Sequence, residues 1–293
     1  MEEGWNLDHE DLRGLSPREF GQVRPDCHGT AVLGVICANH ENELGVMGMV
    51  PQARIGVAPL KVNGDLPNPE DLLQRVASWL RRDSGDVLLV EVGAVRPGQN
   101  PGNCGGYLPM EAWAHGRAAL NFIHARGAYA VEVAANGGFD LDTVPGMPRS
   151  GLAMVVGAGH PQTGVVLGCS NRGTRVDLQG WGGRVVTAGA AECDGHRNLQ
   201  FCEDTNRCYM RSFRGTSSAA AIVAGCVACI SGVVKANGVT PLSAQKMKEI
   251  LIATGSFPDR AHNGGIGPLP NVRNALLTLE QEIQASTPGF RFH

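Results

Sequence analysis

Apolar residues follow two different periods along this chain, and the two periods alternate. Uninterrupted apolar runs predict buried strands, whereas apolar residues that recur every three or four positions predict helices with one buried face. The predicted strands span 53–62, 87–95, 128–134 and 152–157. The predicted helices span 69–82, 109–126, 219–234 and 242–254. This alternation predicts an α/β fold in three layers, a mostly parallel central sheet with helices on both faces.

The composition indicates one well-buried globular domain. Of the 293 residues, 43% are hydrophobic and only 18% are charged, a balance that excludes a disordered protein. We assign residues 1–285 to the domain and residues 286–293 to a C-terminal tail. The net charge of −3 gives no reason to expect nucleic acid or a membrane surface as a partner, and nothing indicates an oligomeric state. No apolar run suggests a membrane span, and the acidic, polar N-terminus shows no signal peptide.

The nine cysteines are an odd number, so at least one of them is unpaired within the chain. Cys193, Cys202 and Cys208 gather in one polar loop, which either carries a disulfide staple or holds free thiols. Cys226 and Cys229 lie on the predicted buried helix, where we expect inert packing thiols. A metal site in this polar loop is disfavoured because the loop contains no CxxC or HxxxH spacing. The cysteine usage leans towards an oxidising compartment.

Three short segments each present one chemically active side chain. His28 opens a His-Gly-Thr motif ahead of an apolar helical pattern, although a polar residue at a helix start would also explain it. Asn136 ends a strand-like run and precedes two glycines, which is equally typical of a plain turn. Ser217, in Gly-Thr-Ser-Ser-Ala, lies where the predicted helix 219–234 begins. Free N–H groups and the helix dipole at such a position favour a developing oxyanion.

The order and contexts of these motifs resemble those of the subtilisin-like serine proteases (subtilases, peptidase S8 family). The resemblance extends over residues 4–275 and includes three further matching segments, 45–53, 169–173 and 176–182. It implies a subtilisin-like fold and a serine endopeptidase that acts on polypeptides. Ser217, which directly follows Thr216, would attack the carbonyl carbon, and His28 would take its proton. Asn136 would donate to the oxyanion together with the Ser217 N–H group.

The resemblance also implies where the substrate binds. An extended peptide would pair with the segment that follows the strand beginning at residue 87, and small residues would line the primary specificity pocket. The residues so assigned are Glu91, Val92, Gly93, Ala134 and Ala135. The small pocket walls suggest room for a sizeable apolar side chain, while Glu91 and Glu132 leave a basic preference open. Glu91 departs from the relatives, which usually carry a small residue there.

The acid that would orient His28 is where this sequence departs from the family pattern. Relatives carry it in an Asp-x-Gly triplet at the end of a first apolar strand, and Glu2-Glu3-Gly4 falls on that triplet. No apolar strand precedes this triplet in the sequence, so we expect the domain to be N-terminally incomplete. Glu2 replaces the acid, or the acid lies upstream of Met1, or the chain is catalytically damaged. We favour the shortened chain; Asp8 and Asp11 are rivals to which we assign structural roles.

Two other functions compete with the endopeptidase. The absent acid-bearing strand is compatible with a non-catalytic subtilase-fold protein that binds peptides or acts as a scaffold. An esterase would require Gly-x-Ser-x-Gly, but the Ser217 motif ends in Ala219. We expect no required cofactor; structural calcium occurs in relatives, yet the nearest acidic pairs, 140–142 and 203–204, are more typical of solvated loops. The family and the cysteine count favour an extracellular location.

Overall fold

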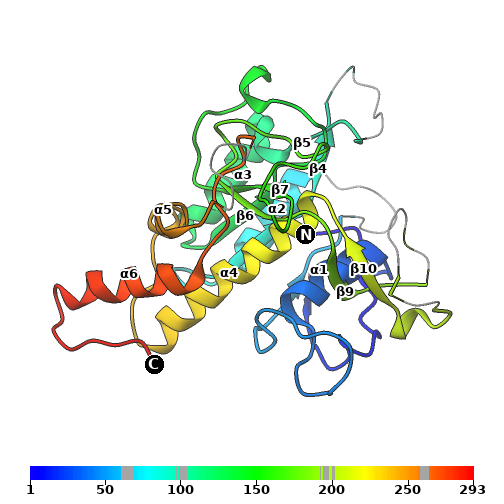
Figure 1. Cartoon of the computed structure of the whole chain (residues 1–293), viewed down its shortest axis with the longest axis horizontal. Coiled ribbons are helices and arrows are strands. Elements are labelled where there is room, and N and C mark those ends of the chain that lie inside the picture. The colour runs from blue at the N-terminus through cyan, green and yellow to red at the C-terminus, as the bar shows by residue number, and fades with distance from the viewer. Residues whose placement is uncertain are drawn as a thin grey trace.

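The structure is a computed structural model, and it describes residues 1–60, 69–96, 98, 104–191, 193, 198–199, 202–257 and 264–293. Its centre is a four-stranded parallel sheet in the order β3-β6-β7-β8 (Figure 1). These strands are β3 (Val87–Val90), β6 (Tyr129–Val133), β7 (Met154–Gly159) and β8 (Leu178–Trp181). The register pairs Leu88 with Ala130 and Val133 with Val156. The predicted parallel sheet is therefore confirmed.

Helices cover both faces of the sheet (Figure 1), and the strand residues divide between the two cores in alternation. One face carries Leu89 and Val131, which join the core formed by α1 (Cys27–Cys37), α4 (Thr216–Ala236), α5 (Ala244–Thr254) and α6 (Val272–Gln284). The other face carries Leu88, Val90 and Ala130, which join the core formed by α2 (Pro69–Trp79) and α3 (Ala114–Ala125). Successive side chains of a strand point to opposite faces, so the chain forms the three layers that we predicted.

Short strand pairs surround the central sheet. The first pair is parallel, β1 (Arg18–Glu19) with β2 (Gly56–Val57); the other two are antiparallel, β4 (Gly93–Val95) with β5 (Tyr107–Pro109), and β9 (Val185–Ala188) with β10 (Tyr209–Phe213). Single 3₁₀ turns lie at Met110–Ala112, Leu141–Thr143 and Thr205–Arg207. The predicted strand 87–95 is thus two strands, because the chain leaves the sheet at Glu91. The predicted strand 53–62 is only two residues long in its described part, and 61–62 lie outside the described residues.

Met1 and Glu2 pair with chain segments on both sides. The Met1 amino group donates to the Leu89 carbonyl at 2.7 Å, and the Glu91 N–H group donates to the Met1 carbonyl at 3.3 Å. On the other side, the Leu60 N–H group donates to the Glu2 carbonyl at 2.7 Å. These two residues are all that the described chain contains of the predicted first strand. A cavity of about 500 Å³ lies beside them, between α1, β3 and α4.

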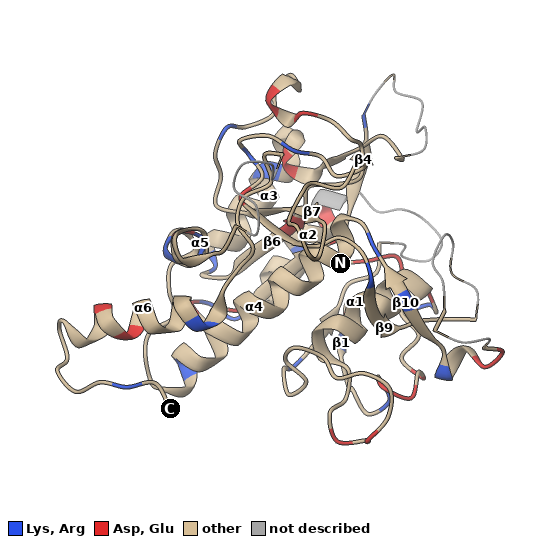
Figure 2. Ribbon diagram, in the orientation of Figure 1, with Lys and Arg blue, Asp and Glu red and all other residues tan. Residues whose placement is uncertain are grey.

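The longest helix, α4, passes under the sheet through the centre of the molecule. Its 21 residues are apolar enough to cross a membrane by length and composition, a feature that the sequence analysis overlooked, but 72% of its most apolar window is buried inside the protein. Lys235, near its C-terminal end, is its one charged residue, so most of the helix is tan in Figure 2. Burial on this scale is typical of the core helix of a globular domain.

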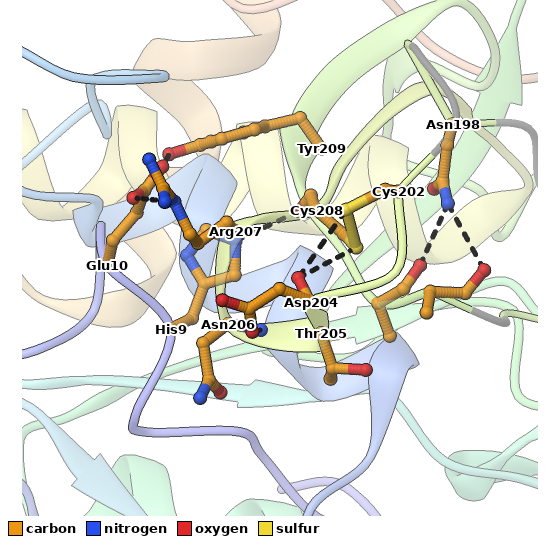
Figure 3. The surroundings of a disulfide bond; sticks show 12 residues. His9, Glu10, Asn198, Cys202, Asp204, Thr205, Asn206, Arg207, Cys208 and Tyr209 are labelled. Atoms are coloured by element: carbon orange, nitrogen blue, oxygen red, sulfur yellow. Dashed lines mark hydrogen bonds and ion pairs between the residues drawn. A yellow bond between two sulfur atoms is a disulfide. The ribbon is translucent and has the colours of Figure 1, made fainter.

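The structure contains three disulfides: two join segments that are far apart in sequence, Cys27–Cys193 and Cys104–Cys169, and one closes a short loop, Cys202–Cys208. For the loop that contains this last pair, the sequence was compatible with either a disulfide or free thiols, and the structure contains the disulfide. Figure 3 shows its surroundings, where the Tyr209 hydroxyl group donates to Glu10 at 2.8 Å. Cys226 and Cys229 are free. Burial raises the pKa of the Cys226 thiol to about 12, which agrees with the predicted packing role.

The C-terminal residues fold back onto the domain. The Phe292 N–H group donates to Glu280 on α6 at 2.9 Å, and the His293 N–H group donates to Asn237 at the end of α4 at 2.9 Å. The Phe292 side chain packs against the core that α4 and α6 share. The division between a domain at 1–285 and a tail at 286–293 remains a prediction, although backbone contacts hold the last residues of the tail in place.

Candidate active site

His28 and Glu2 meet at the N-terminal end of α1. Asp26 caps this helix, because its carboxylate accepts the N–H groups of His28 at 2.8 Å and Gly29 at 3.1 Å, which fixes the turn that presents the histidine. Glu2 Oε1 lies 2.6 Å from His28 Nδ1. The Glu2 side chain is 6% exposed and that of His28 is 36% exposed. The Phe213 ring contacts the imidazole edge to face, with 5.5 Å between the centroids.

The surroundings of His28 favour its protonated form. Burial opposes the charge on the ring, but the negative charge of Glu2 and its hydrogen bond outweigh this effect. Glu91 and Asp26 contribute further negative charge, and the result raises the pKa of His28 to about 9. The Glu2 contact also occupies Nδ1, which leaves Nε2 to exchange a proton with another group.

Ser217 is the second residue of α4. Gly215 precedes the helix with φ at 89°, a conformation that glycine adopts without strain, and this turn places the serine where the first N–H groups of the helix are free. The Ser217 hydroxyl group is one of the influences that lower the pKa of the Glu91 carboxyl group. Among the described residues no hydrogen bond joins it to the His28 ring. Catalytic hydrogen bonds are often long in the absence of substrate.

The neighbouring Ser218 has a different environment. Its hydroxyl group donates to the Trp181 carbonyl at 2.7 Å, and its side chain is fully buried. This hydrogen bond holds Ser218 against β8, so the Ser218 hydroxyl group is already engaged within the protein.

Asn136 follows β6 and turns its side chain towards the start of α4. The turn begins at Ala135, whose φ is 70°. Asn136 Oδ1 accepts the Thr216 N–H group at 3.2 Å and the Thr216 hydroxyl group at 3.3 Å. With the oxygen held in this way, the Nδ2 group remains as a donor, and no described residue accepts from it. The amide therefore has a fixed orientation beside Ser217.

Glu91 is an acidic group whose position the sequence indicated but whose chemistry it did not. Both carboxyl oxygens are buried and lack a full hydrogen bond among the described residues. Burial and the nearby Glu2 carboxylate raise the pKa of Glu91 to about 8, against the opposing effects of His28, the Ser217 hydroxyl group and the Met1 amino group. The structure thus brings together five predicted residues: Glu2, His28, Glu91, Asn136 and Ser217.

The backbone groups of the other predicted substrate-binding residues already form hydrogen bonds within the protein. Val92 leads into β4, where Gly93 pairs with Pro109, so β5 already takes one edge of this strand. Ala134 and Ala135 are buried. Their carbonyl groups accept from the Asn171 side chain at 2.7 Å and from the Asn171 N–H group at 3.1 Å, respectively. Their assignment to a specificity pocket remains a prediction.

Glu132 does not face a substrate pocket, which corrects one expectation from the sequence. It is fully buried in β6 and accepts the Glu111 N–H group at 3.4 Å. Arg175 binds Glu111 at 2.6 Å and also pairs with Asp177. Burial and the adjacent Glu111 raise the pKa of Glu132 well above its usual range. The register of β6 points the Glu132 side chain towards an internal cluster of charged residues. The sequence alone did not determine this register.

Asp11, a rival for the acid, and Asp142, one of the residues considered for calcium, both have other partners. Asp11 is buried and accepts the Val46 N–H group at 2.7 Å and the Asn42 amide at 2.8 Å, so it supports a turn. Asp142 binds Arg149 at 2.7 Å and the Thr174 hydroxyl group at 2.6 Å. The described residues contain no cluster of three or more metal-binding side chains.

The cysteine next to His28 is a site feature that the sequence analysis missed. Cys27 forms a disulfide with Cys193 across 166 residues, so a covalent bond anchors the first turn of α1 to a distant loop. The proximity of Cys27 to the histidine motif was the available signal, but the partner could not be chosen from sequence.

Several solved protease structures superpose on this chain. The prenylagaramide maturation protease PagA is 20% identical, with a TM-score of 0.69 over 95% of this chain and 92% of the other. Fervidolysin from Fervidobacterium pennivorans, a keratinolytic enzyme related to subtilisin, is 20% identical, with a TM-score of 0.67 over 94% of this chain and 41% of the other. A cold adapted subtilisin-like serine proteinase is 17% identical, with a TM-score of 0.60 over 91% and 85% of the two chains. At such identities the likeness shows the fold.

A comparison at the level of sequence families goes further. No curated protein sequence matches the chain, but the sequence profile of the Subtilase family, Peptidase_S8, matches residues 18–272. The matched region contains His28, Asn136 and Ser217, while Glu2 lies ahead of it. Because the match covers most of the sequence and the structural neighbours share the fold, the chain belongs to the subtilase family.

Proposed function

We propose that this subtilase cleaves polypeptides with Ser217 as nucleophile, His28 as general base and Glu2 as the acid that orients the histidine. The observation that carries the proposal is the 2.6 Å contact between Glu2 Oε1 and His28 Nδ1. It supports Glu2, rather than a residue upstream of Met1, in the role that the sequence left open. It also disfavours the catalytically damaged protein and the non-catalytic scaffold.

The proposed reaction uses the groups in a fixed order. Ser217 Oγ attacks the scissile carbonyl carbon while His28 Nε2 takes its proton, and the Glu2 carboxylate stabilises the imidazolium ion. The Asn136 Nδ2 group and the Ser217 N–H group donate to the oxyanion. His28 then protonates the leaving amine, and water hydrolyses the acyl-enzyme by the same steps in reverse. No cofactor is needed for this chemistry, so we expect a chelator to leave the activity unchanged.

The test compares hydrolysis of a chromogenic peptide amide by the wild-type protein and by matched serine variants. Ser217→Ala is expected to lower kcat on the order of 10⁴-fold or more, because it removes the nucleophile. Ser218→Ala, which changes the adjacent hydroxyl group, is expected to retain most of the activity. Hydrolysis by Ser217→Ala at the wild-type rate would overturn the proposal.

A further inference from the structure

The cavity beside Met1 is a gap between two strands. Met1 and Glu2 pair in parallel with a segment on each side. The Leu89 carbonyl accepts the Met1 amino group at 2.7 Å, and the Ala58 carbonyl accepts the Glu2 N–H group at 3.3 Å. On the other side of Met1 from Glu2, no described residue lies between these two segments as a strand. The cavity of about 500 Å³ occupies that position, and its volume is typical of a ligand pocket.

The backbone of β3 is open along the cavity. Successive residues of a strand direct their N–H and carbonyl groups to opposite edges. The Asp86 carbonyl accepts the Tyr129 N–H group of β6 at 2.8 Å, whereas the Leu89 carbonyl accepts the Met1 amino group on the other edge. Val87, two residues before Leu89, therefore directs its N–H and carbonyl groups towards the cavity, as does the Leu89 N–H group. No described residue forms a hydrogen bond with these three groups.

The facing segment is open in the same way. The Ile55 and Val57 carbonyls accept N–H groups from the β1 side, each at 2.9 Å. The intervening Gly56 therefore directs its N–H and carbonyl groups towards the cavity, where no described residue pairs with them. The parallel bridge between Glu2 and Pro59 shows that this segment runs in the direction of the N-terminal residues. One further strand, parallel to both edges, would supply hydrogen bonds to both of them.

The cavity has an apolar wall and a basic entrance. The wall residues come from α1 and α4: Val32, Leu33, Ile36, Ala224 and Ala228. The Ser231 hydroxyl group donates to the Gly85 carbonyl at 2.7 Å, so the C-terminal part of α4 lies at the start of β3. Lys235 on this part of α4 and Arg54 on the facing segment line the cavity with exposed side chains. Neither forms an ion pair with a described residue, so the entrance suits an acidic group.

The opposite end of the cavity presents the Met1 amino group. This group is buried, and the Leu89 carbonyl is its one hydrogen-bond acceptor among the described residues. An ammonium group has three N–H donors, so two of them remain available. Burial lowers the pKa of this amino group, and the negative charges of Glu2 and Glu91 oppose that effect. A carboxylate placed beside it would accept the free donors and favour the protonated form.

We propose that this cavity binds the apolar C-terminal tail of a partner polypeptide, which adds a strand parallel to β3. The last three residues of the tail span the open backbone, at about 3.3 Å per residue. Met1 closes the gap ahead of them, so the strand ends there with its terminal carboxylate beside the Met1 amino group. An acidic residue before the three apolar ones lies near Arg54 and Lys235. Main-chain pairing of this kind supplies affinity, and the side chains supply selectivity. The inference concerns binding and does not depend on the proposed catalysis.

The first test is calorimetric titration of the wild-type protein with short peptides. Acetyl-Asp-Val-Ile-Val with a free carboxylate should bind at one site. The same peptide with a C-terminal amide should bind about 10-fold more weakly or worse, because it lacks the charge-assisted hydrogen bonds to Met1. Acetyl-Asp-Ser-Asn-Ser, which has no apolar side chains, should not bind. Absence of binding by the first peptide, or equal affinity for all three, would overturn the inference.

Protein variants locate the bound peptide and separate this cavity from the proposed active site. Ala228→Leu extends a side chain into the cavity and should weaken binding about 10-fold or more. Ala236→Leu, the same change at an exposed position of α4 outside the cavity, is the matched control and should bind like the wild type. A protein with Val-Ile-Val fused directly ahead of Met1 fills the gap with its own strand and should not bind the peptide. Wild-type affinity in the fused protein would place the peptide elsewhere and overturn the inference.

Amide hydrogen exchange in the wild-type protein tests the strand pairing without any substitution. Saturation with acetyl-Asp-Val-Ile-Val should slow the exchange of the Val87 and Gly56 N–H groups about 10-fold or more, because both gain a hydrogen-bond partner. The Leu88 N–H group, which faces β6, is the internal control and should change less. Unchanged exchange at Val87 and Gly56 in the saturated protein would contradict the proposed strand.

Discussion

The two glutamates of the site differ because of their partners. Glu2 forms a 2.6 Å contact with His28, whereas the Glu91 oxygens are buried without a full hydrogen bond among the described residues. A carboxyl group without such partners is driven towards its neutral form by burial. Glu2 is thus suited to orient the histidine, whereas burial favours the neutral form of Glu91.

The proposed role of Asn136 predicts a specific kinetic defect. Asn136→Ala should lower kcat by about 10²–10³-fold with little change in KM, because a donor to the oxyanion acts mainly in the transition state. Steady-state kinetics on a peptide amide measure both constants. An unchanged kcat would return Asn136 to the alternative interpretation as a simple turn residue.

The Glu2–His28 pair predicts how activity and stability change with pH. Glu2→Gln should lower kcat by about 10²–10⁴-fold and bring the pKa of His28 down from about 9, which an NMR titration of the ring would detect.

The raised pKa of His28 also means that the Glu2–His28 pair stabilises the folded state fully below pH 6.5 and that this contribution is lost as the pH rises through about 9. Glu2→Gln should therefore destabilise the protein more at pH 6 than at pH 10. An equal loss at both values would contradict this account.

At the residue scale, the sequence was sufficient to predict functional side chains that lie at the end of a single helix or strand. His28 and Ser217 each open a helix, and Asn136 follows a strand, so short motifs sufficed to select them. Glu132 was misjudged because the face on which a strand residue points depends on register. The hydrogen bonds between Asn136 and Thr216 join residues that are 80 positions apart, and no local pattern predicts them.

At the element scale, α4 offers a matched test of helix packing. A methyl group added at Gly232 would meet no atom within 4 Å, whereas one added at Gly225 would lie 2.7 Å from Met49 Sδ. Gly232→Ala should raise the free energy of unfolding by about 0.5–1 kcal/mol, because alanine is favoured over glycine within a helix.

Gly225→Ala is the control for this prediction. It gains the same helix propensity but must displace the Met49 side chain, so it should be less stable than Gly232→Ala. Urea unfolding of both variants measures the difference. Equal stabilisation by the two substitutions would show that the contact with Met49 does not limit the packing of α4.

Helices were predicted more accurately than strands, for a physical reason. The predicted helix 242–254 is α5 at Ala244–Thr254, because Ser243 caps its start by accepting the Lys246 N–H group at 3.1 Å. Strand ends are decided by partners elsewhere in the chain. The apolar run 87–95 continues across Glu91, but its first half pairs with β6 and its second half with β5.

At the scale of the whole molecule, the disulfides predict two different losses of stability. Cys27–Cys193 spans 166 residues and Cys202–Cys208 spans six. A longer closed loop restricts the unfolded chain more, so removal should cost about 5 kcal/mol for the first bond and about 2 kcal/mol for the second. Paired Cys→Ser variants compared by guanidinium unfolding test this order. A larger loss at the 202–208 staple would contradict it.

The three-layer arrangement followed from the sequence because strands and helices alternate, but the pairing of cysteines did not. Several connectivities fit the same nine residues, and only the fold brings Cys27 next to Cys193. The cavity beside Met1 also depends on how α1, β3 and α4 meet. Such long-range features emerge from packing between segments rather than from the pattern within one.

The central claim, that Ser217 is the nucleophile of a serine protease, is tested most directly by covalent labelling. A fluorophosphonate probe followed by mass-spectrometric mapping should modify Ser217 in the wild-type protein and in Ser218→Ala. It should fail to label Ser217→Ala, and the labelling rate should fall at least about 10²-fold in His28→Ala, because the general base is removed. Labelling at Ser218, or undiminished labelling of Ser217→Ala, would contradict the account.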